Sequence, residues 1–174
     1  PDICRALELG GTVPFARVAQ NACKDIKQAL EAGARGIIVP MIESRMEMAQ
    51  AVEWAKYPPV GRRGVGYSRA NLFGKRFADY FNSINDELVV VAQIESIHAI
   101  HKLDEILTVN GLDAMIIGPY DLSASMELTG QFEHPDFRSA LALAWEKAKQ
   151  HAVPMGLHIV QPDMEVLRQK IAEG

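Results

Sequence analysis

Short apolar runs alternate along the chain with longer segments in which apolar positions recur every three to four residues. The runs of strand length span residues 12–18, 36–40, 87–95, 114–118 and 155–159. The segments of helical periodicity span residues 24–32, 44–56, 75–83, 97–107, 135–151 and 163–172. This regular alternation is typical of βαβ units, in which consecutive strands run parallel. The pattern therefore predicts an α/β protein with a parallel sheet.

The pattern is less regular at two places. Pro14 lies inside the first strand and has no amide to donate, so that strand should be short or irregular. After the helix at 44–56, prolines at 58 and 59 prevent continuation, and a glycine-rich loop follows at 61–66. A short extra strand at 64–66 and a simple turn are both compatible with this loop. The arginines near it, which could attract an anionic substrate, are Arg62, Arg63 and Arg69.

A doubly wound sheet and a (β/α)8 barrel both fit this order of elements. A doubly wound dinucleotide-binding sheet should carry the sequence GxGxxG directly after its first strand. Neither strand-to-helix turn near the amino terminus has it, so we expect a (β/α)8 TIM barrel. With 174 residues and 48% hydrophobic composition, the chain is long enough for one core and too short to require two domains.

Charge and composition exclude several classes of partner. Lys and Arg total 18 against 22 Asp and Glu, which gives a net charge of -4, and no basic stripe suggests nucleic acid. No apolar run approaches the ~20 residues of a membrane-spanning helix, and the amino terminus lacks a basic-then-apolar signal peptide. We therefore expect a cytoplasmic protein without membrane contact. Cys4 and Cys23 lack the spacing of a metal or redox motif and are expected to be reduced thiols.

Two carboxylates lie about one βα unit apart, at or just past the ends of adjacent predicted strands. Glu95 closes the strand at 87–95, and Asp121 follows the strand at 114–118. Because adjacent parallel strands are only ~5 Å apart and end at the same edge, the two side chains can converge. In barrels this edge holds the active site. Hard oxygen ligands at this edge predict a Mg²⁺ or Mn²⁺ site that water and substrate complete.

Each carboxylate also has a structural interpretation. Glu95 could stabilise the amino terminus of the next helix through its dipole, and Asp121 could cap a helix before Leu122. The sequence GPYDLS at 118–123 favours the functional interpretation. Gly118 permits a close approach of the backbone, and the amides that follow can bind a substrate carboxylate.

Arg17 nearly closes a first strand that is otherwise apolar, where an unpaired guanidinium would be costly to bury. An ion pair with Glu31 and a donor role toward an enolate oxygen explain it equally well. His158 lies on an apolar strand, and His98 and His101 lie on a helix. None of the three has the spacing of a zinc site, so core or surface positions are expected for them.

Five segments match a known family: 15–17 (FAR), 32–41 (AGARGIIVPM), 63–66 (RGVG), 93–95 (QIE) and 117–123 (IGPYDLS). On these residues the chain resembles the class II pyruvate aldolases of the HpcH/HpaI family, which also contains relatives of the citrate lyase beta subunit. The resemblance covers nearly the whole chain, and the last two segments together are quite specific.

The resemblance implies a role for each site residue. Glu95 and Asp121 would bind a divalent metal, Mg²⁺, Mn²⁺ or Co²⁺, and Arg17 would stabilise the enolate oxygen. Glu31 falls where the family has an acid that tunes the catalytic histidine, and a helix-surface acid is the alternative. The residues implied to bind the substrate are Arg17, Gln93, Gly118, Pro119, Tyr120 and Asp121.

The resemblance also implies an activity. It is that of an aldolase that reversibly cleaves 4-hydroxy-2-oxo acids to pyruvate and an aldehyde through a metal-stabilised enolate, in a homo-oligomer that is often a hexamer. A citrate-lyase-like CoA-ester lyase and a non-catalytic barrel subunit are the alternatives. The family's first strand, with the general-base histidine just beyond it, would precede Pro1, and its eighth strand would follow Gly174. We therefore expect a barrel that lacks its first and last strands.

Overall fold

The strands of the computed structural model form one parallel sheet. The structure describes residues 1–159 and 162–173. Within these residues the strands are β1 (Phe15–Arg17), β2 (Gly36–Val39), β3 (Val89–Ile94), β4 (Ala114–Ile117) and β5 (Met155–Leu157). They pair in sequential order, and every pairing is parallel. Sequential order without a reversal is that of a barrel wall and not of a doubly wound sheet. The predicted fold class is therefore confirmed.

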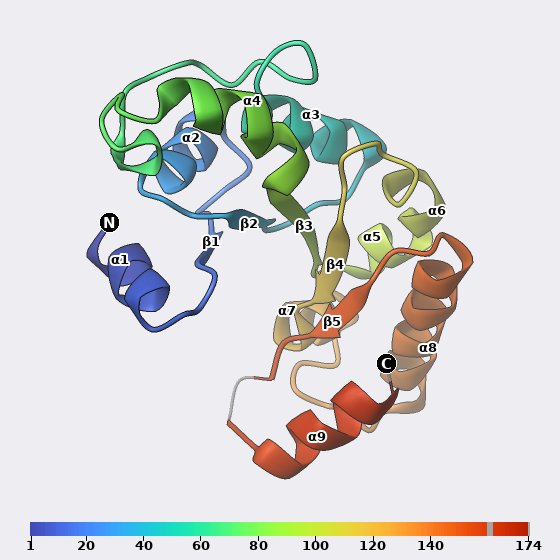
Figure 1. Cartoon of the computed structure of the whole chain (residues 1–174). Helices are drawn as coiled ribbons and strands as arrows, with labels where there is room; N and C mark the ends of the chain where they lie inside the picture. The colour runs from blue at the N-terminus through green and yellow to red at the C-terminus, as the bar shows by residue number, and fades with distance from the viewer. Residues whose placement is uncertain (160–161, 174) are drawn as a thin grey trace.

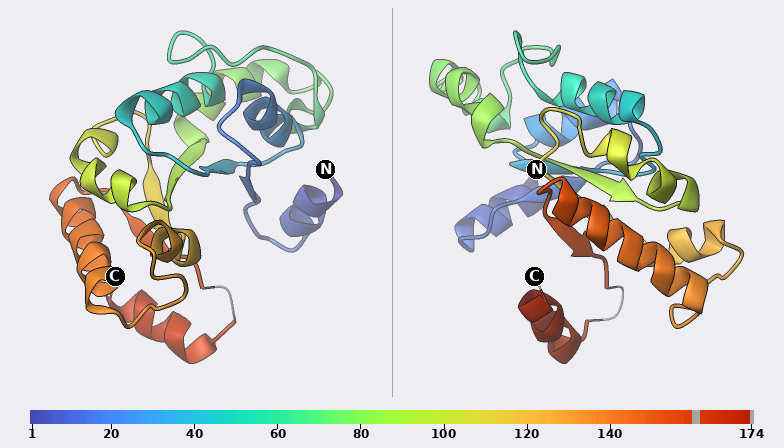
Figure 2. Two further views of the ribbon diagram at one scale, coloured as in Figure 1. Left: turned by 180° about the vertical axis from the view of Figure 1, so that it is seen from behind. Right: turned by 90° about the vertical axis from the view of Figure 1, so that its right-hand side faces the viewer.

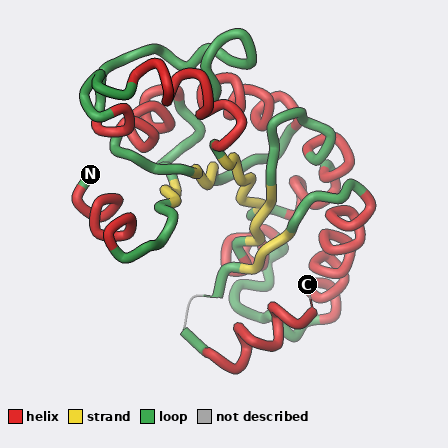
Figure 3. The backbone as a smooth tube through the Cα atoms, in the orientation of Figure 1, coloured by secondary structure: helices red, strands yellow, loops and turns green. Residues whose placement is uncertain are grey.

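Helices surround this curved sheet, most of them on its outer side. They are α1 (Asp2–Leu9), α2 (Cys23–Glu31), α3 (Arg45–Ala55), the 3-10 turn η1 (Arg69–Asn71), α4 (Phe77–Glu87), α5 (Ile97–His101), α6 (Leu103–Ile106), α7 (Pro119–Ser125), α8 (Pro135–Gln150) and α9 (Met164–Glu173). Helices α2 to α6 and α8 follow the outside of the arc (Figure 1, Figure 3). Helices α1 and α9 lie beyond its two ends, toward β1 and β5 (Figure 2). No helix among the described residues is long and apolar enough to cross a membrane.

Alternate residues of each strand face opposite sides of the sheet, and the two sides differ in chemistry. In β2, β3 and β4 the outward positions are apolar and at most 1% exposed: Ile37, Val39, Val90, Ala92, Ile94, Met115 and Ile117. Each of these side chains other than that of Ala92 contributes roughly 1.5–3 kcal/mol of hydrophobic stabilisation. The inward positions include Arg17, paired with Ile38, and Gln93, paired with Ile116. The core therefore lies between sheet and helices, which leaves the inner face for polar side chains.

The predicted strands are all present, and each is shorter than predicted. The first begins only after Pro14, as its missing amide led us to expect. The carbonyl of Pro14 still accepts a hydrogen bond from the amide of Arg35 (2.8 Å), while its ring nitrogen has no proton to donate. The third begins two residues later than predicted, because Glu87 ends α4 and pairs with Arg35 (3.0 Å).

The alternative of a strand at 64–66 is wrong. In the part of the chain that the structure describes, this segment pairs with no strand. The amides just before it, of Arg62 and Arg63, donate to the carbonyls of Glu53 and Lys56 near the end of α3 (2.6 and 2.9 Å). The loop is therefore attached to a helix and not to the sheet.

The helices also depart from the prediction in places. The predicted helix at 97–107 is divided at Lys102 into α5 and α6, and α4 continues four residues beyond the predicted end at Ser83. Helices α1 and α7 were not predicted. No residue of α1 is buried, and its apolar side chains Ile3 and Leu9 are exposed.

An ionic cluster joins α6 to the end of α8. Asp104 accepts a hydrogen bond from Nζ of Lys147 (2.7 Å), and its other oxygen lies 2.9 Å from Nε2 of His151. The hydrogen bond from Lys147, followed by that from His151, lowers the pKa of Asp104 from its ordinary value.

We predict that Asp104→Asn lowers the urea midpoint at neutral pH and loses this effect in acid. A lowered folded-state pKa means that the contribution is present above the unfolded pKa, about 3.9, and is lost as the pH falls through the folded value. Urea midpoints of both proteins between pH 7 and pH 2 measure it. As a control, Glu146→Gln removes an exposed acid of α8 and should change little. A difference independent of pH would contradict the assigned role of Asp104.

Candidate functional site

A cavity of about 440 Å³ opens at the carboxyl ends of the strands, on the inner face of the sheet. Its lining consists of Arg17, Ile38, Gln93, Glu95, Ile116, Gly118, Pro119, Tyr120, Asp121 and His158. These residues belong to β1 through β5 or directly follow those strands. All the residues predicted to bind metal or substrate therefore surround one cavity, at the edge where parallel strands place their functional groups.

Glu95 is buried and held from two sides. It follows β3, and only 4% of it is exposed. One carboxylate oxygen accepts a hydrogen bond from the amide of Met41 (2.9 Å), and the other accepts one from Nε2 of Gln93 (2.5 Å). The cap of α5 is Ser96, whose hydroxyl accepts from the amide of Ala99 (3.1 Å). Glu95 thus lines the cavity, and the capping hydrogen bond of α5 comes from Ser96.

Gly118 leaves the space that Glu95 occupies. A Cβ at position 118 would lie 2.9 Å from Cγ and Oε1 of Glu95 and 3.3 Å from Nε2 of Gln93. Gly118 has φ -92°, a backbone conformation that residues with a side chain also adopt. Glycine is therefore required here because a side chain would not fit beside Glu95. The close approach predicted at Gly118 is confirmed, and its neighbour is the carboxylate of Glu95.

Asp121 lies in the first turn of α7. The helix begins at Pro119 and has Gly118 as its N-cap residue, so the alternative that Asp121 caps a helix is wrong. Proline suits this position, because a first-turn amide has no partner within the helix. Asp121 is exposed and lines the cavity. In the sequence it follows Gly118, whereas Glu95 precedes it.

Arg17 and Glu31 are not brought together. Arg17 ends β1, is exposed and lines the cavity. Glu31 ends α2, which leads into the amino end of β2, and it pairs with Lys27 (3.6 Å). The predicted alternative of an Arg17–Glu31 ion pair is therefore wrong, and Glu31 does not line the cavity.

His158 was expected to be a core or surface residue, and the structure places it in the cavity lining. Its amide donates to the carbonyl of Ile117 (3.0 Å), which continues the β4–β5 pairing by one residue. Within β5, Gly156 pairs with Ile116 of the inner face, so His158, two residues further, lies on that same face. Only the pairing between strands reveals this, because an apolar run alone does not say which side is inner.

The arginines near the glycine-rich loop serve the fold. Arg63 is 2% exposed, lies 4.5 Å from the ring centre of Tyr57 and donates to the hydroxyl of Tyr80 (3.2 Å). Arg62 pairs with Glu53 (3.0 Å). None of these arginines belongs to the described lining of the cavity at the strand ends.

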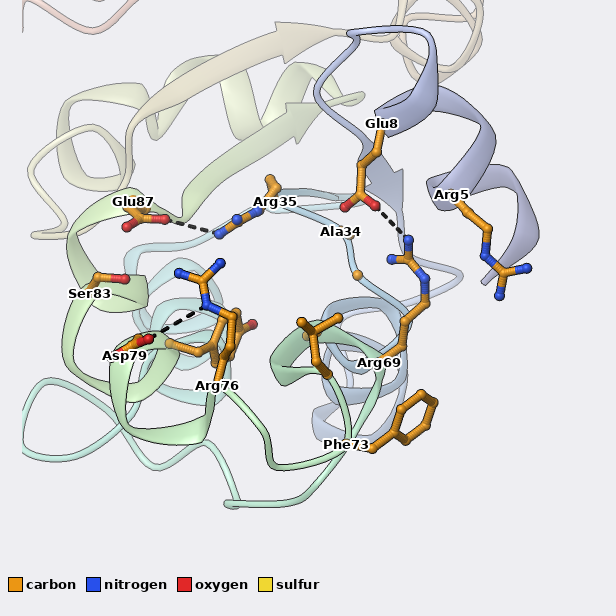
Figure 4. A pocket seen from close by; sticks show the side chains of 14 residues that line it. Arg5, Glu8, Ala34, Arg35, Arg69, Phe73, Arg76, Asp79, Ser83 and Glu87 are labelled. Carbon is orange, nitrogen blue, oxygen red and sulfur yellow. Dashed lines mark hydrogen bonds and ion pairs between the residues drawn. The ribbon is translucent and has the colours of Figure 1, made fainter.

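A second cavity, of about 410 Å³, lies near the residues that precede β2 and β3 (Figure 4). Four arginines line it, and each has an acidic partner at 2.5–3.6 Å: Arg5 with Asp2, Arg35 with Glu87, Arg69 with Glu8, and Arg76 with Asp79. Arg69 also donates to the carbonyl of Ala32 (3.2 Å) and passes directly over Gly33, whose φ is +109°. Two of these ion pairs connect different elements: Arg35 joins the residue before β2 to the end of α4, and Arg69 joins η1 to α1.

The residues of the first cavity fit a hard divalent cation. Among residues 1–159 and 162–173, no three His, Cys, Asp or Glu side chains are grouped closely enough to hold a metal by themselves. The donor set is the two carboxylates of Glu95 and Asp121. Mg²⁺ and its analogues are commonly bound by one or two carboxylates, with water and substrate as the other ligands. Each oxygen of Glu95 accepts one hydrogen bond from the protein and keeps further acceptor capacity.

Fold and site together define a parallel α/β protein with a two-carboxylate site at the carboxyl ends of its strands. A family model described as HpcH/HpaI aldolase/citrate lyase matches residues 2–174. The chain belongs to this HpcH/HpaI aldolase/citrate lyase family.

Comparisons with individual proteins agree with this family. A 5-keto-4-deoxy-D-glucarate aldolase of Enterobacter sp. (strain 638) is 37% identical over 153 residues, which are 87% of this chain and 59% of that protein. A solved HpcH/HpaI aldolase/citrate lyase family protein from Burkholderia cenocepacia J2315 superposes with a TM-score of 0.90 and 34% identity, over 98% of this chain and 68% of the other. The citrate synthase SbnG superposes with a TM-score of 0.84 and 28% identity, over 99% and 66%. The chain thus spans about three fifths of the curated relative's length.

We predict that Gly118→Ala weakens Mn²⁺ binding by a factor of about 10 or more, because the new methyl group must displace the carboxylate of Glu95. Isothermal titration with Mn²⁺ measures the affinity. Gly156→Ala is the matched control: it adds a methyl group to the same inner face, where the nearest atom is Ile116 Cγ1 at an ordinary 3.7 Å. Equal affinities of the two variants would show that the space at Gly118 does not matter for the site.

Proposed function

We propose that the protein containing this chain is a divalent-metal-dependent aldolase that reversibly cleaves 4-hydroxy-2-oxo acids to pyruvate and an aldehyde. The main support is that Glu95, Asp121, Arg17 and Gln93 line one cavity at the carboxyl ends of parallel strands. Relatives named 5-keto-4-deoxy-D-glucarate aldolase support an aldol cleavage in particular. Because the chain spans only part of these relatives, the activity of the whole protein belongs to the proposal.

Glu95 and Asp121 would hold the metal, which we propose to be Mg²⁺, Mn²⁺ or Co²⁺. When bound, such a cation polarises the substrate carbonyl and stabilises negative charge on its oxygen. Gln93 has a positioning role here, because its amide donates to one oxygen of Glu95 and leaves the carboxylate little freedom to turn. Fixed ligands of this kind bind a cation with less loss of conformational freedom.

The 2-oxo acid would be bound by the start of α7 and by Arg17. The amides of Tyr120 and Asp121 belong to the first turn of α7, where helix amides have no partner within the helix and attract a carboxylate. Tyr120 packs edge-on against Phe132, with ring centres 4.9 Å apart, which fixes its place at the cavity. Arg17 would donate to the carbonyl oxygen as it gains negative charge during cleavage of the C3–C4 bond.

Glu31 stays in this proposal only as an acid that tunes the family's catalytic histidine, because it lies outside the described lining of the cavity and pairs with Lys27. The proposal also includes small-molecule substrates and a cytoplasmic location. It further includes a homo-oligomer, which by analogy with the family is a hexamer. They rest on the family relationship and not on the geometry of the site.

We predict that Glu95→Gln and Asp121→Asn each reduce metal-dependent pyruvate release by a factor of about 100 or more, because each removes one anionic ligand. The assay uses the full-length protein, including any residues that flank this chain, after removal of metal with a chelator. Pyruvate release from 4-hydroxy-2-oxo acids is measured before and after addition of Mg²⁺, Mn²⁺ or Co²⁺. Both variants should melt close to the wild-type temperature.

Glu146→Gln serves as the control, since it removes an exposed acid of α8 outside the cavity and should retain full activity. Unchanged turnover in Glu95→Gln and Asp121→Asn would overturn the site. Failure of the wild type to release pyruvate with any of the three metals would overturn the aldolase function and favour a CoA-ester lyase or a non-catalytic subunit.

A further inference from the structure

His158 presents a hydrogen-bonding side chain to the cavity, and the proposed aldol chemistry gives it no role. Among the described residues its imidazole has no hydrogen bond or ion pair; only its backbone amide is engaged, with Ile117. The hydroxyl of Tyr120 is likewise without a partner in that part of the chain, although the ring packs on Phe132. Both side chains are exposed and line the cavity. Among the described residues, no protein group competes with a ligand for either side chain.

The register of the strands places His158 on the far side of the cavity from Arg17. Arg17 ends β1 at one edge of the sheet, and His158 follows β5 at the other. Between them, Ile117 pairs with Leu157, so Gly118 and His158 come next along the same two strands. Because Gly118 has no side chain, nothing from β4 separates Glu95 from His158 at this level. The space beside the carboxylates therefore extends to the imidazole.

The groups around the cavity divide into two sets. In the proposed function, Arg17, the cation held by Glu95 and Asp121, and the first-turn amides of α7 account for the carboxylate and carbonyl end of a bound 2-oxo acid. Two side chains of the lining that donate hydrogen bonds are left over: Tyr120 in α7, which follows β4, and His158, which follows β5. The described lining has no carboxylate other than the two proposed metal ligands, so we place the rest of the substrate against these two donors. A group that accepts hydrogen bonds suits them better than an aliphatic chain does.

We infer that His158, assisted by Tyr120, makes the enzyme prefer certain aldehydes to aliphatic ones. In the preferred aldehydes the group next to the carbonyl carbon accepts hydrogen bonds, as a carboxylate or a hydroxymethyl group does. This inference rests on the proposed aldolase function and adds a specificity determinant to it. His158 takes no part in the making or breaking of the carbon–carbon bond.

The test uses three aldehydes of two carbons each, which differ only in that group: glyoxylate (carboxylate), glycolaldehyde (hydroxymethyl) and acetaldehyde (methyl). The value of kcat/KM for metal-dependent addition of pyruvate to each is measured in full-length wild type, His158→Leu and His158→Gln. His158→Leu should lose a factor of about 10 or more with glyoxylate and glycolaldehyde, the size of one lost hydrogen bond, and stay within about twofold with acetaldehyde. His158→Gln keeps a donor and should recover part of the loss.

Two further variants separate specificity from folding. Tyr120→Phe removes only a hydroxyl and should shift the preference among the aldehydes in the same direction. His98→Leu removes an exposed histidine of α5 outside the cavity and should leave the preference unchanged. Two results would overturn the inference alone. In the first, His158→Leu has the same kcat/KM as the wild type with each of the three aldehydes. In the second, it loses the same factor with all three. No metal-dependent addition by the wild type with any aldehyde overturns the proposed function, and the inference with it.

Discussion

The fit of the Glu95 carboxylate beside Gly118 is the constraint on which the rest of the site depends. Glu95 leaves β3 at the edge where β4 also ends, and a side chain at position 118 would occupy its place. The amide of Met41 and the side chain of Gln93 then fix the two oxygens. Three neighbouring strands thus determine the direction of a single carboxylate. A buried anion held in this way is available to a cation and requires little rearrangement on binding.

The sheet separates stability from function by the alternation of its side chains. Outward positions such as Ile37, Val90 and Ile117 are fully buried under helices and supply the core. Inward positions near the carboxyl ends carry the polar residues of the cavity. The arginines at the other end of the sheet are occupied with ion pairs: Arg35, just before β2, binds Glu87 of α4, and Arg69 of η1 binds Glu8 of α1. A polar side chain of the cavity can therefore be substituted without a change in the apolar layer between sheet and helices.

The sequence was sufficient for the parts of the fold and site that depend on local pattern. Buried parallel strands are apolar on both faces, so β2, β3 and β4 were visible as runs, and Glu95 and Asp121 followed from the ends of two of them. Which face of an edge strand turns inward depends on pairing with a distant strand, and for this reason His158 was missed. The role of Glu31 came from the family resemblance alone and stays a prediction, because the histidine that it would tune is not among the residues of this sequence.

The central claim is that Glu95 and Asp121 form one cation site that a 2-oxo acid completes. Crystals of the full-length protein soaked with Mn²⁺ and pyruvate, measured for anomalous scattering, test it most directly. The account predicts one strong peak about 2.1 Å from a carboxylate oxygen of each residue, with pyruvate as a further ligand. A Mn²⁺ peak at other residues, or a cavity that binds pyruvate without Mn²⁺, would contradict it.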